Sequence, residues 1–292
     1  MLAVVGDLLE DILVRIDTAP VLGTDTPATI DRRRGGSAAN VAASAAMIGA
    51  AVRFIGRVGA DGLGDRLLRD LVADGVDVRV QRGGRTGSVV VLVGPDGERT
   101  MLPDRAAATQ LIDVDPAWLD GVTWLHVPSY SLLTEPIGTA TRDLIVELRR
   151  NGGRVSVDVS SVAIVDGYGV GRFHDLLADV APDVLFANHD ESRVLPETAH
   201  GVVIVKDGPR PVRVRSSCAP SVVDVPPLPS VADSTGAGDA FAAGYLAATV
   251  RGENLHDAVT AGIALAARVL RRERASTDSP STGHCNRATP LS

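Results

Sequence analysis

The chain has 292 residues, which is long for one domain and short for two full-sized ones, so we expect one large domain with a small appendage. Hydrophobic residues make up 45% of the chain and charged residues 22%, as in an average globular protein, which excludes wholesale disorder and a coiled coil. The formal net charge of −7 gives no support for a basic face, so we expect no nucleic-acid partner.

The cysteines and the apolar stretches indicate a cytoplasmic protein that does not enter a membrane. Cys218 and Cys285 are the only cysteines, too few for a disulfide framework or a metal site. The first 16 residues carry acidic side chains and no basic leader, unlike a signal peptide. The longest uncharged stretch, residues 35–52, is too short and too polar to span a membrane.

The first part of the chain alternates between buried elements and exposed strands. The apolar run at residues 2–5 predicts a buried strand, and residues 12–34 alternate apolar with polar side chains between turn residues, which predicts exposed strands. An Ala-rich helix is expected over residues 38–49, a buried strand over 52–55 and a second helix over 63–73.

Residues 76–105 are strand-like again, with a turn at Pro95-Asp96-Gly97. The β-rich segments 12–34 and 79–105 therefore interrupt the α/β alternation. Paired with each other, they would form a small β-sheet at one edge of the main domain, where it is well placed to act as a lid.

From residue 106 onward strands and helices alternate regularly, which predicts a mostly parallel sheet with helices on both faces. The expected strands are 123–127, 155–159, 183–187 and 202–206, and the expected helices are 135–150, 171–179, 237–250 and 255–272. We assign residues 1–11, 35–78 and 106–275 to an α/β core. Residues 276–292 are rich in Ser, Thr, Pro and Gly, which predicts a disordered tail.

The most informative string is Asp-Ser-Thr-Gly-Ala-Gly-Asp at residues 233–239. Gly236, Ala237 and Gly238 form a turn before a helix, where backbone N–H groups and the helix N-terminus bind an anion such as phosphate. A carboxylate beside such a site is explained if Asp239 acts as a base on a hydroxyl that attacks the phosphate. The alternative is that Asp239 caps the helix and the glycines make a tight turn.

This string resembles the C-terminal signature of the ribokinase-like (PfkB) carbohydrate kinase family. Gly-Gly-Ser-Ala-Ala-Asn-Val-Ala at residues 35–42 resembles the family's N-terminal signature, which continues to Asp-Gly-Val-Asp at residues 74–77. The resemblance covers roughly residues 1–275. It implies a three-layer α/β/α core with a mostly parallel sheet, a small β-sheet lid, and an ATP-dependent kinase that phosphorylates a hydroxyl of a sugar or a nucleoside.

The same resemblance implies the roles of individual residues. Asp239 would be the catalytic base, and the turn from Gly236 through Ala237 to Gly238 would be the anion hole for the transferring phosphoryl group. A polyol needs carboxylate and amide acceptors, and glycines let it approach the backbone. The ordinary structural explanations are a surface acid for Asp11, a turn for Gly35 and Gly36, and a polar helix residue for Asn40. The expected substrate residues are Asp11, Gly35, Gly36, Asn40 and Ser129.

On the nucleotide side, Asn188 and Glu191 match the family's N-x-x-E motif, in which Glu191 would hold Mg²⁺ through water. A helix start capped by Asn188 is the structural alternative. Asp233 and Thr235 match positions that help bind a monovalent cation, such as K⁺, in many members. The residues implied to bind ATP are Asn188, Lys206, Gly208, Gly236 and Gly238.

Three departures from the family's pattern lie on the nucleotide side. Only 18 positions separate Asn188 from Lys206, so we expect an outer helix to be shortened or lost. Pro211 stands where a second glycine is usual, and the chain after Arg271 lacks the family's Gly-Ala turn near adenine. Because of these departures, a non-catalytic sugar-binding relative of the kinases stays an alternative prediction.

Composition also bears on the partners. Aromatic residues are only 3% of the chain, which leaves few rings to stack a nucleobase. This favours a sugar as the substrate, with a nucleoside kinase as the alternative.

Arg99 and Arg105 lie on the second lid segment, where they would either reach an anionic substrate or be solvated. Exposed lid strands have open edges that a second copy would cover, so we expect a homodimer through the lid.

Overall fold

The structure is a computed structural model that describes residues 1–196, 201–216, 220–228 and 234–277. Its centre is a nine-stranded sheet with the order β13-β12-β11-β10-β9-β8-β1-β4-β5. The seven strands from β11 to β5 pair in parallel, and β12 and β13 add an antiparallel hairpin at one edge. The strands are β1 Leu2–Val5, β4 Val52–Val58, β5 Asp77–Arg82, β8 Trp124–Pro128, β9 Arg154–Asp158, β10 Val184–Asn188, β11 Val202–Asp207, β12 Arg210–Arg215 and β13 Ser221–Val223.

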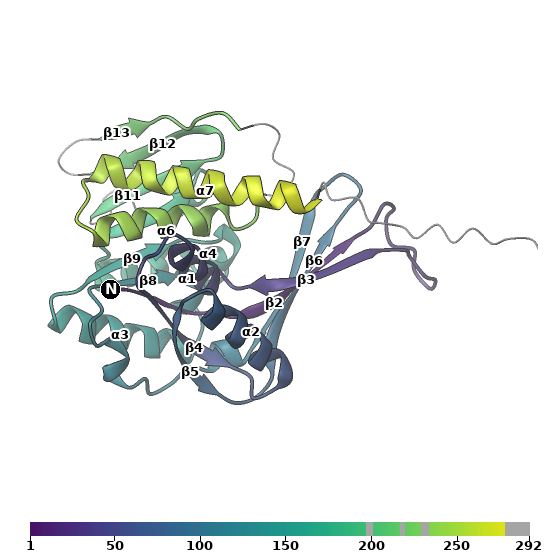
Figure 1. The fold of residues 1–292 in the computed structure, drawn as a ribbon, viewed down its shortest axis with the longest axis horizontal. Coiled ribbons are helices and arrows are strands. Elements are labelled where there is room, and N and C mark those ends of the chain that lie inside the picture. Colours follow the sequence, from purple (N-terminus) through teal and green to yellow (C-terminus); the bar gives the residue numbers. More distant parts are fainter. Residues whose placement is uncertain (197–200, 217–219, 229–233, 278–292) are drawn as a thin grey trace, which may run out of the picture.

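Helices cover both faces of this sheet, because its central strands are apolar on both sides. In β1, Leu2 and Val4 pack into one hydrophobic cluster, whereas Ala3 and Val5 pack into the other. The result is the expected three-layer α/β/α core (Figure 1). Helices α1 Ser37–Met47, α2 Gly62–Ala73, α6 Ala237–Val250 and α7 Leu255–Thr277 cover the first face, and α3 Ile137–Arg150, α4 Val162–Tyr168 and α5 Val170–Val180 cover the second.

A second sheet of four strands projects from one side of the core (Figure 1). It has the order β3-β2-β6-β7 and consists of β2 Leu9–Arg15, β3 Thr29–Gly35, β6 Thr86–Val93 and β7 Arg99–Ala106. The expected pairing of the two β-rich segments is therefore confirmed. We call this sheet the lid.

The boundaries between lid and core differ from the predicted ones. Strand β2 begins at Leu9, so residues 9–11, which we expected in the core, belong to the lid. Residues 79–82 lie in β5, which pairs with β4 in the main sheet, although we expected them in the lid. An edge strand of a parallel sheet is only half-buried, so its alternating side chains resemble those of an exposed lid strand.

The C-terminal third contains further differences. The β12–β13 hairpin was not predicted, and α7 runs to Thr277 instead of ending at Arg272. Ser276 and Thr277 are thus helical, whereas the rest of the expected tail lies outside the described residues. Between β10 and β11 the described helical structure is one 3-10 turn, Glu191–Val194, which agrees with a shortened outer helix.

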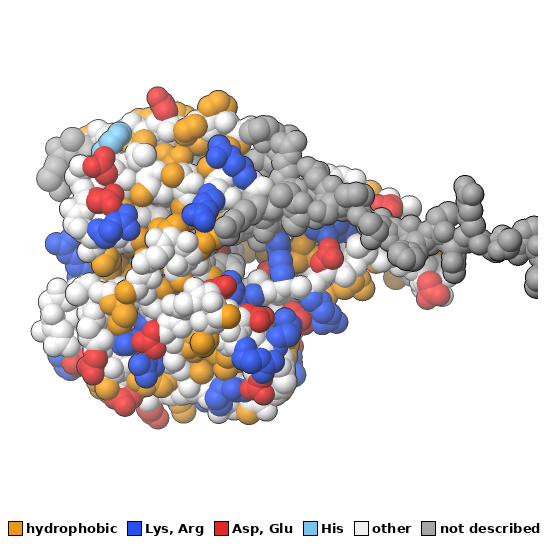
Figure 2. All heavy atoms as spheres, viewed as in Figure 1, with side chains coloured by type: hydrophobic (Ala, Val, Ile, Leu, Met, Phe, Trp, Pro, Cys, Tyr) orange, Lys and Arg blue, Asp and Glu red, His pale blue; other side chains and the backbone are white. Residues whose placement is uncertain are grey.

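Ion pairs tie the lid to the core. Glu10 on β2 is almost fully buried and binds Arg66 of α2 at 2.5 Å. Arg105 at the end of β7 makes two hydrogen bonds, of 2.6 and 2.9 Å, to the Asp7 carboxylate after β1. Arg105 is therefore a buried anchor and not the solvated arginine or anion ligand that we expected. Figure 2 shows acidic and basic side chains interspersed over α2 and the base of the lid.

Small residues allow α6 and α7 to pack closely. A β-carbon on Gly244 of α6 would lie 2.6 Å from the Ala261 carbonyl oxygen of α7, so only glycine fits there. Three aromatic rings gather under these helices, where Phe186 of β10 makes edge contacts with Phe241 and Tyr245. None of the helices in the described stretches is both long and apolar enough to cross a membrane.

Phe186→Ala should lower the free energy of unfolding by about 3–5 kcal/mol, because it leaves a cavity at the centre of the aromatic cluster. Urea unfolding measures this change. Val146→Ala removes a side chain that is 49% exposed on α3 and should change stability by less than about 0.5 kcal/mol. Equal effects of the two substitutions would contradict the assignment of Phe186 to the core.

Candidate functional site

The candidate site lies where the carboxyl ends of the parallel strands meet the start of α6 and the inner side of the lid. Ligands bind at this edge in open α/β sheets. Asp7 follows β1, Asp158 ends β9, Asn188 ends β10 and Lys206 lies near the end of β11. The topology therefore brings together residues that are far apart in the chain.

Helix α6 begins with the predicted glycine turn. Gly236 is its N-cap, with φ of +76°, and no side chain caps the helix. The first N–H groups of a helix have no acceptor within the helix, so this turn presents donors to an anion. Asp239 lies in the first turn but binds α1 instead of capping its own helix, so the alternative explanation as an N-cap is wrong.

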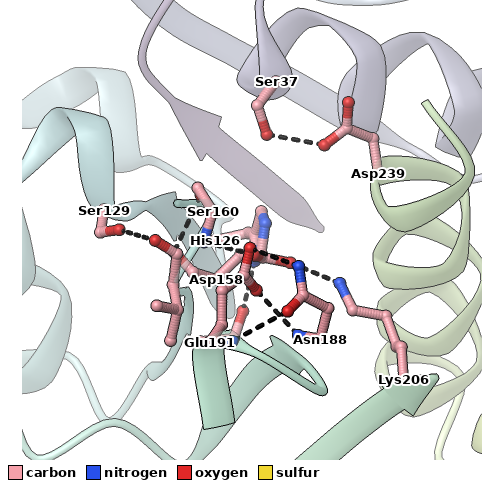
Figure 3. A network of polar contacts seen from close by, with 11 residues as sticks. Ser37, His126, Ser129, Asp158, Ser160, Asn188, Glu191, Lys206 and Asp239 are labelled. Carbon is pink, nitrogen blue, oxygen red and sulfur yellow. Dashed lines mark hydrogen bonds and ion pairs between the residues drawn. The ribbon is translucent and has the colours of Figure 1, made fainter. Parts of the chain in front are cut away.

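The Asp239 carboxylate is held by two donors from α1, of which Figure 3 shows Ser37. The Ser37 hydroxyl donates to Oδ1 at 2.7 Å, and the Asn40 side-chain amide donates to Oδ2 at 3.1 Å. Burial raises the pKa of Asp239 to about 6, although both hydrogen bonds favour the ionised form. The carboxylate is thus fixed in direction and able to accept a proton near neutral pH. Sequence analysis missed Ser37.

A cavity of about 120 Å³ is lined by Asn40, which holds this carboxylate. It brings together Asp11 of the lid, Asn40 of α1 and Gly236, as expected for a substrate site. Burial raises the pKa of Asp11, and Arg33, whose Nε lies 3.9 Å from the carboxylate, opposes this shift. The lining residues are Asp11, Arg33, Arg34, Asn40, Ala43, Ser44, Thr235, Gly236 and Val269.

Gly35 and Gly36 let the chain pass close to two acidic residues. A β-carbon on Gly35 would overlap the Asp11 carboxylate, and one on Gly36 would overlap the Asp7 carbonyl oxygen. Gly36 also has φ of +97°, which side chains other than glycine rarely adopt. The two glycines therefore position Asp11 and the start of α1, and their place in the substrate site stays a prediction.

Two expected ligands have other partners in this structure. Ser129 is fully buried and its hydroxyl donates to the Val159 carbonyl, so it supports the framework and does not line the cavity. The Thr235 hydroxyl accepts a hydrogen bond from Arg99 of the lid. Asp233, its expected companion in a cation site, lies outside the described residues.

Asn188 and Glu191 hold each other in a reciprocal turn. The backbone N–H and the side-chain amide of Asn188 each donate to the Glu191 carboxylate at 2.8 Å, and the Glu191 N–H donates to the Asn188 side-chain oxygen at 2.8 Å. Glu191 is buried, and burial together with the nearby Asp158 charge raises its pKa. The turn thus presents a fixed polar group at the strand ends.

Lys206 forms an ion pair with Asp158, which sequence analysis did not single out (Figure 3). The Nζ–Oδ2 distance is 2.8 Å. On the same side of the sheet, His126 of β8 is fully buried, and burial lowers its pKa to about 4, so it is neutral. An acidic residue at the end of a buried apolar strand is the signal that would have identified Asp158.

The β11–β12 turn accommodates the unusual proline. Gly208 lies in this tight turn. The strand register shifts between the pairs Asp207–Arg210 and Val205–Arg213, and Pro211 lies at this irregularity. A proline at such a position removes no regular hydrogen bond from the sheet.

The described residues contain no cluster of three or more His, Cys, Asp or Glu side chains that could enclose a metal ion. An all-protein metal cage is therefore absent from this part of the chain. The buried Glu191 carboxylate at the strand ends suits a Mg²⁺ ion that is held mainly by water and nucleotide phosphates, which is the usual preference of Mg²⁺.

Comparisons with known proteins agree with this geometry. The profile described as pfkB family carbohydrate kinase matches residues 1–282. The chain is 31% identical over 286 residues to an ATP-dependent ribose-1-phosphate kinase of Halopiger xanaduensis, which covers 92% of each chain. It is 30% identical over 239 residues to a fructokinase of Klebsiella pneumoniae, which covers 73% of this chain and 76% of the relative. A protein of Escherichia coli provisionally named ribokinase II, solved in complex with ATP and Mg²⁺, has a TM-score of 0.78 at 26% identity over 91% of each chain.

Ser37→Ala should raise the pKa of Asp239 above its value of about 6, because the lost hydrogen bond stabilises the ionised carboxylate. A pH titration of aspartate carboxyl ¹³C signals, assigned with Asp239→Asn, measures this value. Ser44→Ala, on the same helix, is the control. A wild-type pKa near 4, or an unchanged pKa in Ser37→Ala, would contradict the geometry.

Proposed function

Because the chain belongs to the pfkB family of carbohydrate kinases, we propose that it transfers the γ-phosphoryl group of ATP to a hydroxyl group of a sugar. One observation carries this proposal. The Asp239 carboxylate, with its raised pKa, lies in the first turn of the anion-binding helix α6 and is held by Asn40, which lines a polar cavity. This is the place for a base that acts on a hydroxyl next to a phosphoryl group.

The acceptor sugar binds in the cavity under the lid. The Asp11 carboxylate accepts hydrogen bonds from its hydroxyl groups, and Gly35 and Gly36 leave room beside them for that carboxylate and for the Asp7 backbone. Asn40 lines the same cavity while it holds Asp239, so it couples the sugar to the base. The lid excludes water, which would otherwise compete as acceptor.

In the transfer step, the sugar hydroxyl oxygen forms a bond to the γ-phosphorus while the bond from that phosphorus to the β–γ bridging oxygen breaks. The hydroxyl proton passes to the Asp239 carboxylate. Backbone N–H groups of the turn from Gly236 to Gly238 stabilise negative charge on the phosphoryl oxygens. The products are a sugar phosphate and ADP.

The nucleotide lies at the ends of β10 and β11, near Asn188, Lys206 and Gly208. This assignment is supported by the resemblance and by Lys206, whose Nζ would lie 3.4 Å from a β-carbon on Gly238 in the anion-binding turn. Glu191 holds Mg²⁺ through water. When bound, Mg²⁺ supplies positive charge to the phosphate oxygens. A monovalent cation such as K⁺ at Asp233 and Thr235 remains a prediction.

The cavity supports a sugar over a nucleoside as the acceptor. Its described lining contains no aromatic side chain that could stack a nucleobase. Carboxylate, amide, hydroxyl and guanidinium groups line it instead, and these groups suit a polyol.

The outer face of the lid supports a homodimer. The strand register aligns Ile12 with Val90 and Val90 with Leu102, while Ile30 pairs with Val14 in the next row of the same face. Ile30 is 58% and Leu102 56% exposed. A second copy of the chain is the occupant we propose, because the same face and the open edges of β3 and β7 would then be buried in both copies.

Asp239→Asn should lower kcat by roughly 10²–10⁴-fold, the usual contribution of a general base. A coupled ADP-release assay with ATP, Mg²⁺ and K⁺ measures this against ribose, fructose, 2-keto-3-deoxygluconate, sugar phosphates and nucleosides. In the wild type, kcat/KM should fall below about pH 6, because a protonated Asp239 cannot accept the hydroxyl proton. Asp257→Asn changes an exposed acid in the first turn of α7 and is the matched control.

Turnover of Asp239→Asn near the wild-type rate would refute the assigned base. Turnover with nucleosides alone would replace the sugar with a nucleoside acceptor. No turnover with any acceptor, together with no ATP binding by calorimetry, would support the non-catalytic binding protein instead.

Gly35→Ala should raise KM for the sugar by roughly 10–100-fold, because the new methyl group displaces the Asp11 carboxylate and weakens hydrogen bonds to a charged acceptor. KM for ATP should stay within about threefold. Gly171→Ala adds the same methyl group at a position on α5 with no atom within 4 Å and is the control. An unchanged sugar KM in Gly35→Ala would remove Asp11 from the sugar site.

A further inference from the structure

We propose that Lys206 and Asp158 form a catalytic pair in which the Lys206 ammonium binds the transferring phosphoryl group and Asp158 positions it. This inference rests on the proposed kinase reaction. It adds a direct role in the transfer step for Lys206 and a positioning role for Asp158.

The pair is fixed at the carboxyl ends of two strands. Lys206 lies near the end of β11 and Asp158 ends β9, so the ion pair spans the intervening strand β10. The lysine side chain is 16% exposed and the aspartate side chain 10%. Asp158 is held independently of Lys206, because the Ser160 N–H donates to its other carboxylate oxygen at 2.9 Å. The carboxylate can therefore orient the ammonium group.

The ammonium lies against the anion-binding turn. A β-carbon on Gly238 would be 3.4 Å from Lys206 Nζ, and Figure 3 shows the lysine beneath the start of α6. The N-terminus of a helix carries partial positive charge, which attracts an anion. Lys206 adds a full positive charge beside it, so a phosphoryl group bound at the turn would be within reach of both.

The acidic groups around Lys206 also indicate that it binds phosphate. The carboxylates of Asp158, Glu191 and Asp239 all act on Lys206. Burial alone would lower the pKa of Lys206, but the charge and hydrogen bond of Asp158, with the charges of Glu191 and Asp239, together hold it above its usual value, so the ammonium stays charged. Without this cation, three acidic groups would repel a polyphosphate. An ammonium group has three donors, and within the described residues only Asp158 accepts a hydrogen bond from it, which leaves donors to bind phosphoryl oxygens.

Lys206 forms and breaks no covalent bond in this role. It stabilises charge on the non-bridging phosphoryl oxygens while the new oxygen–phosphorus bond forms and the old one breaks. The proton of the acceptor hydroxyl still passes to Asp239. A buried ion pair such as Lys206–Asp158 is often no more stabilising to the fold than an apolar pair of similar size, so fold stability gives little reason for this pair.

Lys206→Met should lower kcat by roughly 10²–10³-fold, the effect of removing one donor from a charge-stabilising site, with KM for the sugar within about threefold. Asp158→Asn should also lower kcat. The double variant should be no slower than Lys206→Met alone, because Asp158 acts through Lys206. Thermal unfolding of each variant separates loss of catalysis from loss of fold. Arg251→Met, which removes an exposed cation paired with Glu253 at the far end of α6, should keep the wild-type kcat.

A second measurement needs no variant to fold. The chain has one lysine, so selective ¹⁵N-lysine labelling gives a single side-chain signal. A non-hydrolysable ATP analogue with Mg²⁺ should shift this signal at least twice as far as ADP with Mg²⁺, because ADP lacks the γ-phosphoryl group. Equal shifts, or no shift with either nucleotide, would overturn the proposal.

The two proposals can fail separately. If Asp239→Asn loses turnover while a folded Lys206→Met keeps kcat within about threefold of wild type, the kinase stands and the catalytic pair is refuted. If the wild type turns over no acceptor, the proposed function fails, and the lysine signal still reports whether Lys206 binds the terminal phosphate. Additive losses in the double variant would refute the positioning role of Asp158.

Discussion

The position of the Asp239 carboxylate is the constraint on which the rest of this structure depends. It has to lie in the first turn of α6, beside an anion-binding turn, and yet point away from its own helix. Ser37 and Asn40 hold it there from α1, at 2.7 and 3.1 Å, so α1 and α6 must pack closely. The small residues of both helices permit this approach, and Gly35 and Gly36 let α1 begin directly against the acidic residues of the lid and the core.

Charged groups surround this carboxylate at the strand ends. The Asp11 carboxylate on the lid lines the cavity, Asn40 lines it too and holds Asp239, and Lys206, paired with Asp158, lies close to Gly238 of the anion-binding turn. Acceptors for hydroxyl groups and donors for phosphate are therefore linked through Asp239 and its helix. The lid belongs to the same arrangement, because ion pairs such as Glu10–Arg66 fix its base to the core.

Local patterns were sufficient to predict most elements of the core and the glycine turn before α6. Helix α6 runs over Ala237–Val250 as predicted, and the glycine turn before it needs no distant residue for recognition. The misassigned strand β5 and the Asp158–Lys206 pair depend on tertiary context. An edge strand resembles a lid strand, and Asp158 meets its partner 48 residues later in the chain. Ser129 was assigned to the substrate because sequence cannot show that its hydroxyl turns toward the Val159 carbonyl.

The central claim is that Asp239 takes the proton of a sugar hydroxyl beside the phosphoryl group. A crystal structure with the accepted sugar and a non-hydrolysable ATP analogue tests it most directly. The account predicts one sugar hydroxyl within about 2.6–3.2 Å of an Asp239 carboxylate oxygen and in line with the γ-phosphorus. A sugar bound in the cavity with no hydroxyl within reach of Asp239 would contradict it.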